Sequence, residues 1–381
     1  MSAAQEPSAS LTADEAMALR MRALLLAGHG FTTPGQVVEW FGAMQAQDVA
    51  SGHWSFGVRL PGLTEADVTR ATEDRQIVRT WPMRGTIHFV PPADARWMLE
   101  VTGARQLRGL GPRWGRLGID ETMVRRASEV LAEVLAGGRV LTRAQCLEAL
   151  TEAGLEPVGQ RGYHYLWWSS QVGVTVIGPQ RGKEQTFALL DDWVPQSREV
   201  ERVEGLTILA ERYLRSHGPA TLKDFAGWIG MPMSDARAGV VALGDRVVTV
   251  DVGGVPMLAL AASLAERSAL DSHPLLDSHR VVVLPGFDEY LLGFKDRALM
   301  AESATMAAVI PGGNGIFRNT IVVGGRVRAT WTRSVRATRV AVEVLTLGAW
   351  RPTRAQQDGV AARFDGFAAF LGLPDATVSY R

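Results

Sequence analysis

The chain has 381 residues, of which 46% are hydrophobic and 21% charged, and its 40 basic and 40 acidic residues give no net charge. This composition is typical of a folded protein of two to four modules. No apolar run approaches the roughly 18 residues that a membrane span requires. Residues 1–10 lack the features of a secretory signal, and the single Cys146 excludes an internal disulfide and a multi-cysteine zinc site. We expect a cytoplasmic protein with no membrane partner and a disordered tail over residues 1–10.

The basic residues are almost all arginines. Three of the 40 are lysines and 37 are arginines. A high genomic GC content would produce this bias by itself. Arginine nevertheless suits contacts with phosphates and base edges, because its guanidinium is a planar fork of donors. Zero net charge argues against a simple polyelectrolyte binder, but it is compatible with a local basic groove.

Residues 11–118 form the first predicted unit, in which short helices precede a two-stranded ribbon. Capping boxes and a proline in a first turn mark helix starts, and a turn joins two extended runs. The predicted elements are helices that begin at Thr12, Thr33 and Thr64, followed by extended runs over 78–81 and 85–90. Helices followed by such a ribbon are typical of a winged helix.

The same order is predicted twice more, over residues 119–197 and 198–268, although the units share no sequence period. Their predicted helices cover 121–136, 143–153, 163–168, 199–216, 221–229 and 234–243, and their ribbons cover 174–177 with 185–189 and 246–252 with 255–258. Residues 269–381 are predicted to be a β-rich domain. Its signals are a buried strand at 280–285, a hairpin with a Gly324-Gly325 turn, and an amphipathic closing helix over 354–371.

Gln45 and Gln47 place two carboxamides one residue apart, directly before Asp48. Residues at i and i+2 point to the same side only where the chain is extended. We therefore place the pair just past the second predicted helix and before Gly52. The two side chains could form a polar site, or they could cap a helix end and satisfy nearby backbone groups. Asp48 could likewise cap a helix, form a surface salt bridge, or add negative potential to the pair.

Four segments resemble the AlkZ/YcaQ-type winged-helix family, whose characterised members are DNA glycosylases. They are Gln45-Ala46-Gln47-Asp48, Arg84-Gly85-Thr86-Ile87-His88, Leu284-Pro285-Gly286-Phe287-Asp288-Glu289-Tyr290-Leu291-Leu292-Gly293 and Asn314-Gly315-Ile316-Phe317-Arg318. The resemblance implies an α+β fold with three tandem winged-helix units and a C-terminal β-barrel-like domain, in a C shape around duplex DNA. It also implies that Gln45 and Gln47 are the catalytic pair, since they match the family's Gln-x-Gln motif.

The chemistry of a carboxamide restricts the reaction. A glutamine amide does not titrate usefully, so it cannot act as a strong acid or base. A purine alkylated at N7 or N3 is already cationic and leaves readily, so the site need only orient a water and stabilise an oxocarbenium-like sugar. The resemblance and this chemistry predict a monofunctional glycosylase without a cofactor, acting in base excision repair or genotoxin self-resistance. Bulky adducts and interstrand crosslinks are alternative substrates.

Several side chains are candidates for contact with duplex DNA. His88 alternates with two apolar neighbours, which predicts that it points away from the core beside Arg84. Otherwise it is a solvated strand histidine. The Gly178–Lys183 turn lacks the spacing of a phosphate loop and is predicted to be a wing tip. The full set of predicted DNA-contacting residues is Arg84, His88, His53, His164, Lys183, Arg318 and Arg328.

Strand alternation over residues 326–333 predicts one apolar face and one polar, basic face that carries Arg328. Arg318 is expected nearby on the paired strand. The basic face is either solvated or part of a DNA clamp opposite the glutamine pair.

Two adjacent carboxylates, Asp288 and Glu289, resemble an acid–base pair, but neighbouring side chains diverge in a helix or a strand. We therefore predict that they hold the C-terminal domain against the winged helices. The seven histidines show no metal-binding spacing, so no metal is predicted. The expected protein is a monomer whose partner is duplex DNA with alkylated purines. The alternative is a non-catalytic DNA-binding regulator, since winged helices generally bind DNA without chemistry.

Overall fold

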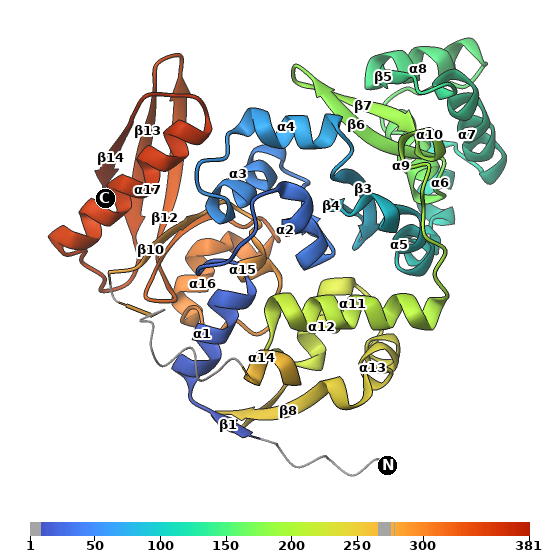
Figure 1. Cartoon of the computed structure of the whole chain (residues 1–381). Coiled ribbons are helices and arrows are strands. Elements are labelled where there is room, and N and C mark those ends of the chain that lie inside the picture. The colour runs from blue at the N-terminus through green and yellow to red at the C-terminus, as the bar shows by residue number, and fades with distance from the viewer. Residues whose placement is uncertain (1–8, 266–275, 278) are drawn as a thin grey trace.

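The computed structural model describes residues 9–265, 276–277 and 279–381 (Figure 1). Over these ranges the fold is α+β, with helices around sheets of three, five and six strands. Figure 1 shows the N-terminal part, in blue, between the green helices and ribbon of residues 119–197 and the orange and red C-terminal sheet. Within the described residues, no helix is both long enough and apolar enough to cross a membrane.

The N-terminal part begins its predicted helices where the capping signals lie, with reciprocal capping boxes at Thr12, Thr33 and Thr64. Its elements are α1 (Ala13–Ala23), α2 (Pro34–Phe41), β2 (Met44–Gln45), α3 (Val49–Arg59), α4 (Glu65–Glu73), β3 (Val78–Met83), β4 (Thr86–Val90), α5 (Ala95–Val101) and α6 (Gly111–Leu117). Short 3₁₀ turns of the chain lie at Pro92–Asp94, Gly103–Leu107, Gly244–Arg246 and Pro311–Gly313.

Helix α3 is absent from the sequence prediction. Gly52, Gly57 and the β-branched Val58 weaken its helical signal, because each lowers intrinsic helix propensity. The helix forms because its apolar side packs into the core, where Trp54 and Phe56 are buried. Tertiary packing thus overrides local propensity directly after the glutamine pair.

The second and third units repeat one order of elements. The second contains α7 (Glu121–Leu135), β5 (Val140–Thr142), α8 (Arg143–Glu152), α9 (Arg161–Gln171), β6 (Thr175–Arg181), β7 (Glu184–Leu189) and α10 (Leu190–Trp193). The third contains α11 (Arg202–His217), α12 (Leu222–Ile229), α13 (Met233–Val241), β8 (Val247–Val252), β9 (Val255–Leu260) and α14 (Ala261–Ala265). In each of the three units the strand after the first helices pairs with the last strand: β2 with β4, β5 with β7, and a bridge from Ala220 to Leu258.

Two connections between units are tertiary features that the sequence did not predict. Strands β3 and β6 pair at Arg79 and Ile177, which joins the first two ribbons into one sheet of order β2-β4-β3-β6-β7-β5. Strand β1 (Ala9–Leu11) pairs in parallel with β8 of the third unit. Residues 9 and 10 are therefore strand and not disordered tail, while residues 1–8 and the predicted boundary at 268/269 lie outside the described residues.

The C-terminal part is an open sheet, so the predicted barrel-like closure is wrong. Its elements are β10 (Val281–Leu284), α15 (Glu289–Leu292), α16 (Ser303–Val309), β11 (Asn319–Val323), β12 (Arg326–Arg336), β13 (Arg339–Thr346), α17 (Arg354–Phe370) and β14 (Ala376–Tyr380). The strand order is β10-β11-β12-β13-β14, with the two outer strands unpaired to each other. Five strands leave an apolar face to cover, and α17 covers it by packing Phe364 and Phe367 edge-on against Trp331.

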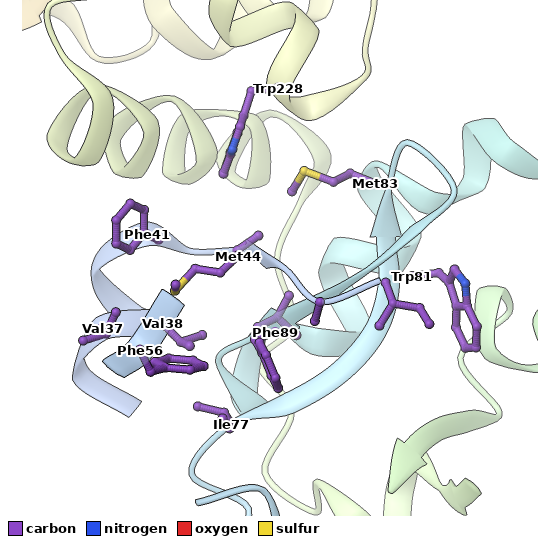
Figure 2. Close-up of a cluster of buried hydrophobic side chains, with 14 of the residues drawn as sticks. Val37, Val38, Phe41, Met44, Phe56, Ile77, Trp81, Met83, Phe89 and Trp228 are labelled. Carbon is purple, nitrogen blue, oxygen red and sulfur yellow. The ribbon is translucent and has the colours of Figure 1, made fainter. Parts of the chain in front are cut away.

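A continuous apolar cluster supports the strand that carries Gln45 (Figure 2). Most of the side chains labelled in the figure come from the first unit, and Trp228 on α12 comes from the third. The labelled buried side chains are Val37, Val38, Phe41, Met44, Phe56, Ile77, Trp81, Met83, Phe89 and Trp228. Burial of each of these large side chains stabilises the fold by about 1.5–3 kcal/mol. The strand is therefore held by a well-packed core to which two units contribute.

Candidate active site

Gln45 lies on the two-residue strand β2 and Gln47 in the bend that follows it, between helices α2 and α3, where the sequence placed the pair. Helix α2 ends at Gly42, whose φ of 80° turns the chain out of the helix. Strand β2 then pairs Gln45 opposite His88 of β4. Asp48 closes the segment as the N-cap of α3, because its Oδ1 accepts a hydrogen bond of 2.8 Å from the Ser51 N–H. Of the three alternatives for Asp48, helix capping is confirmed.

The two carboxamides differ in their surroundings. Gln47 is exposed, and its Oε1 accepts a hydrogen bond of 3.0 Å from the Ile87 N–H, which ties it to β4. Gln45 is half-buried, and its buried Oε1 has no hydrogen-bond partner among the described residues. A buried acceptor left unpaired costs about 1–3 kcal/mol. Such a cost in a polar pair suggests a role other than stability.

Helix α3 approaches β2 closely because Gly52 has no side chain. A Cβ atom at Gly52 would lie 3.0 Å from Cε2 of Phe89 and 3.3 Å from the carbonyl oxygen of Gln45. Any larger residue would push the helix away from the strand. Gly52 therefore sets the distance between the glutamine segment and the helix that follows it.

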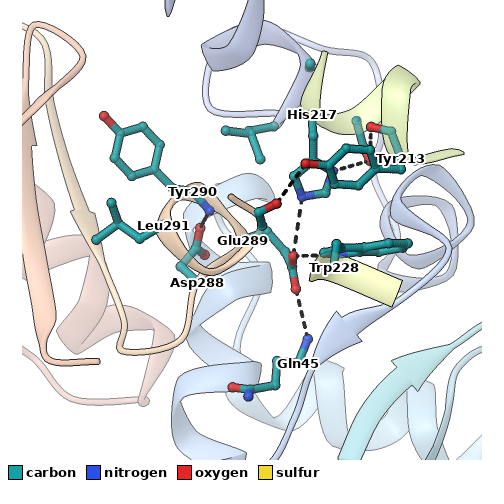
Figure 3. Close-up of polar contacts among 12 residues, drawn as sticks. Gln45, Tyr213, His217, Trp228, Asp288, Glu289, Tyr290 and Leu291 are labelled. Carbon is teal, nitrogen blue, oxygen red and sulfur yellow. Dashed lines mark hydrogen bonds and ion pairs between the residues drawn. The ribbon is translucent and has the colours of Figure 1, made fainter. Parts of the chain in front are cut away.

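Glu289 holds the backbone of Gln45 from the side opposite β4 (Figure 3). Its side chain is 1% exposed. Its Oε1 accepts a hydrogen bond of 3.2 Å from the Gln45 N–H, and its Oε2 accepts 3.0 Å from Nε1 of Trp228 and 3.3 Å from Nε2 of His217. Burial raises the pKa of this carboxyl, but the hydrogen bond from His217 and the charges around it prevail and lower the pKa to about 2. Glu289 is therefore ionised at neutral pH.

Asp288 points the other way, into α3. It forms a two-pronged ion pair with Arg59, whose Nη1 and Nη2 lie 2.8 and 3.0 Å from its oxygens. Ser55 Oγ and the Tyr290 N–H donate to the same carboxylate. The two adjacent carboxylates thus diverge and hold the C-terminal part against the first and third units, which agrees with their predicted structural role.

Arg84 and His88 occupy the inside of the site rather than its surface. Arg84 and Gly85 both have positive φ, 56° and 69°, which is the geometry of a type I′ hairpin turn. The turn directs the guanidinium inward, where Nη1 donates to the Trp228 carbonyl at 2.7 Å and Nη2 to Nε2 of His88 at 2.9 Å. We therefore expect Arg84 to link the first unit to the third, in place of the phosphate contact predicted from sequence.

The predicted outward orientation of His88 is wrong, since its ring is 0% exposed. Arginine can only donate, so Nε2 of His88 accepts, and the ring proton lies on Nδ1, which donates to the Thr86 carbonyl at 2.8 Å. Simple alternation failed because strand β4 is covered on both faces, by α3 on one side and by the Arg84 side chain on the other. A buried ring offers a phosphate no surface.

The buried His88 gives a testable pH dependence. Burial and the adjacent Arg84 charge lower its pKa from 6.5 to about 3. Below pH 6.5 the unfolded chain binds a proton that the native chain does not, so the free energy of unfolding falls as pH falls from 6.5 towards 3, by up to about 1.4 kcal/mol per pH unit. We expect His88→Gln to make the pH dependence shallower by up to that slope, measured by denaturant unfolding at pH 7, 6 and 5. Parallel curves for the variant and the parent would contradict the assignment.

Two further predicted DNA contacts are buried. His53 is 7% exposed, stacks on Phe89, and has its Nδ1 3.4 Å from Oε1 of Glu65. His164 is 3% exposed and packs edge-on against Tyr163 and Trp167, without a hydrogen-bond partner for either ring nitrogen among the described residues. Both rings face inward because their helices, α3 and α9, are buried along most of their length.

The remaining predicted contacts are accessible. Lys183 is exposed at the tip of the β6–β7 ribbon. Arg328 is half-buried on β12 near the Gly324-Gly325 turn, whereas Arg318 is exposed just outside β11, next to Asn319, which pairs with Trp331. The two arginines therefore lie at opposite ends of the hairpin and not side by side as expected. Their contact with DNA stays a prediction.

Sequence reasoning predicted a structural role for Glu289 but missed its contact with Gln45 and the residues that surround it. The residues around the pair belong to α3, α11, α12 and α15, which are far apart in the sequence: Arg59, His217, Trp228 and Glu289. Local periodicity carries no information on contacts between such distant segments. The only signal was the Asp288-Glu289 dipeptide, which is unusual beside an apolar run. Among the described residues, no group of three or more His, Cys, Asp or Glu side chains could hold a metal ion.

The AlkZ-like DNA glycosylase family matches residues 38–370 of the chain. An interstrand DNA cross-link repair glycosylase from Streptomyces sahachiroi is 28% identical over an alignment of 334 residues that covers 83% of this chain and 86% of that protein. The solved structure of the Streptomyces sahachiroi DNA glycosylase AlkZ superposes with a TM-score of 0.80 at 24% identity, over 98% of this chain and all of the other. The resemblance seen in the motifs is confirmed, and the chain belongs to the AlkZ-like DNA glycosylase family.

Proposed function

We propose that the protein is a monofunctional DNA glycosylase that excises purines carrying a cationic N7 or N3 alkyl group, with Gln45 and Gln47 as the catalytic residues. The observation that carries the proposal is the free acceptor of Gln45. Its Oε1 is buried and has no partner among the described residues, and Gln47 follows two residues later in the same connection between α2 and α3. A positioned acceptor of this kind suits a water molecule or the positive charge of an oxocarbenium-like sugar.

The step that we propose balances without an acid or a cofactor. The bond between C1′ of the sugar and the purine nitrogen breaks, and the base takes the electron pair and leaves neutral. The oxygen of a water held by the carboxamides forms the new bond to C1′, and the water gives up one proton to solvent. The product is an abasic site in an intact strand.

Binding of duplex DNA is assigned to the three repeated units. The order helix, strand, helix, helix and ribbon, with the first strand paired to the last, supports their interpretation as winged helices that together hold a duplex. The exposed tip of the β6–β7 ribbon is the clearest candidate for a wing on the phosphate backbone. The C shape around DNA and the monomeric state remain part of the proposal.

The proposal is tested by incubating the purified chain with methylated duplex DNA and measuring free 7-methylguanine. We expect base release and alkali-labile sites in the DNA. A relative is an interstrand DNA cross-link repair glycosylase, so a second arm should compare N7 monoadducts of a nitrogen mustard with its N7–N7 crosslinks. Tight duplex binding without any base release would favour the alternative, a non-catalytic DNA-binding protein.

The salt dependence of binding distinguishes the roles of Lys183 and Arg84, two of the basic residues that the sequence put forward. We expect Lys183→Ala to lower the slope of log affinity against log salt by about one, because an exposed lysine that contacts a phosphate releases one counterion. We expect Arg84→Ala to leave that slope unchanged, because its guanidinium bonds to Trp228 and His88. Fluorescence anisotropy with an undamaged duplex at several salt concentrations measures both. A lower slope for Arg84→Ala alone would reverse the assignment.

A further inference from the structure

Glu289 lies where three separate parts of the chain meet the glutamine segment. It belongs to the short helix α15 of the C-terminal part, and its three donors come from β2, α11 and α12 (Figure 3). Both carboxylate oxygens are used, and the side chain is 1% exposed. No lysine or arginine of the described residues lies within ion-pair distance of it, whereas neighbouring Asp288 is fully paired with Arg59.

The geometry of β2 explains what the carboxylate does there. Strand β2 is the edge strand of its sheet. In an antiparallel pair, alternate N–H groups point away from the partner strand and lack an acceptor. The Ala46 N–H bonds to Ile87 of β4, so the Gln45 N–H points outward, and Glu289 accepts it.

We propose that Glu289 is the positioning residue of the active site. Resting on the proposed function, it fixes the backbone of Gln45, and through Gln45 the acceptor that faces the sugar. It also makes the catalytic geometry depend on the docking of the third unit and of the C-terminal part, which supply His217, Trp228 and Glu289 itself. A buried carboxylate held mainly by neutral donors lowers the stability of the fold, which is consistent with a role in positioning rather than in stability.

A single substitution tests whether the carboxylate matters for position. Glu289→Gln keeps the size of the side chain but offers one acceptor and one NH₂ group to three donors. If the carbonyl faces Gln45, the NH₂ group opposes the indole N–H of Trp228. If the carbonyl faces Trp228, the NH₂ group opposes the Gln45 N–H. Either way one contact is repulsive, and the indole competes with Gln45 for the single acceptor.

This competition suggests a rescue. In the double variant Glu289→Gln with Trp228→Phe, the indole N–H is gone. The amide can then accept from the Gln45 N–H while its NH₂ group donates to His217 in the other tautomer. The position of Gln45 is restored although the protein has lost a further hydrogen bond. If Glu289 only stabilised the fold, the double variant should excise more slowly than either single variant, because the two losses of stability would add.

The experiment measures single-turnover excision of 7-methylguanine at saturating enzyme, together with the Kd for the same duplex. We expect Glu289→Gln to slow excision by about 10- to 100-fold, the scale for a small misplacement, with Kd changed less than about threefold. The double variant should excise at the rate of Trp228→Phe alone. Asp288→Asn is the matched control, since it alters the adjacent buried carboxylate without touching Gln45, and its excision rate should stay within about threefold of the parent at a temperature below its unfolding.

A second readout needs no activity. The exchange of the Gln45 backbone amide hydrogen is measured by mass spectrometry of peptides covering 44–48. Its rate should rise at least about tenfold in Glu289→Gln and return to about the parent's rate in the double variant. Unchanged exchange in Glu289→Gln, or slower excision that Trp228→Phe worsens, overturns the positioning role. If the parent excises nothing while the exchange pattern appears as described, the proposed function fails and the positioning of Gln45 by Glu289 stands.

Discussion

Replacing both Gln45 and Gln47 with alanine is expected to reduce excision of N7-alkylguanine by at least about 100-fold, the scale for removing positioned polar groups. Duplex binding should be kept, because neither carboxamide carries charge. The loss should appear in the single-turnover rate, measured with enzyme in excess over a duplex that contains one 7-methylguanine. Excision by the double variant at a rate near that of the parent would remove the pair from the mechanism.

Asp48 provides the control for this experiment. Asparagine caps helices as well as aspartate does, so Asp48→Asn should preserve the start of α3 and change the excision rate only a few-fold. A loss as large as that of the double variant would mean that the Asp48 charge contributes to the reaction, in addition to its observed bond to the Ser51 N–H.

The largest expected loss of stability comes from Arg59→Met. The substitution removes a guanidinium with 0% side-chain exposure from Asp288, which is 3% exposed, and leaves a buried, uncompensated charge. Breaking such a pair costs about 3–5 kcal/mol, a large part of the roughly 5–15 kcal/mol that holds a typical domain together. Denaturant unfolding at pH 7 measures the change in the free energy of unfolding.

Two further variants make the result specific to burial. Adding Asp288→Asn to Arg59→Met should recover part of the loss, because the stranded charge is removed. The exposed pair of Arg125 with Glu121 serves as a matched control, and Arg125→Met should cost less than about 0.5 kcal/mol. A loss for Arg59→Met no greater than that of Arg125→Met would show that the buried pair does not anchor α3 to the C-terminal part.

Two adjacent carboxylates of the C-terminal part hold the elements around the active site. Asp288 holds the far end of α3, and Glu289 holds the strand that precedes α3. One turn of the C-terminal part therefore contacts both the glutamine segment and the helix that follows it. Gly293, four residues on, permits this packing, since a Cβ atom there would lie 2.4 Å from the ring of His217. The motif from Leu284 to Gly293 is thus read as a structural support for the N-terminal pair.

The sequence by itself determined features whose causes are local. Capping boxes, a first-turn proline and glycine turns predicted where helices begin and where ribbons reverse, and the structure confirms these boundaries within a few residues. The extended state of the segment that carries Gln45 also followed from the residues themselves. Neighbouring residues in the chain set the hydrogen bonds that span three or four residues and the φ preferences of glycine and proline. These features can therefore be predicted from the sequence without knowledge of the fold.

Only the tertiary structure decided the features that depend on what covers a surface. Alternation placed His88 outward because a strand usually has one solvated face, but β4 is covered on both. The guanidinium of Arg84 turns inward because the Trp228 carbonyl, far along the chain, is there to accept it. The joining of β3 with β6, the open edge of the C-terminal sheet and the hold of Glu289 on Gln45 have the same origin. Contacts between distant segments are selected by packing and by the need of buried polar groups for partners, and neither is encoded in local periodicity.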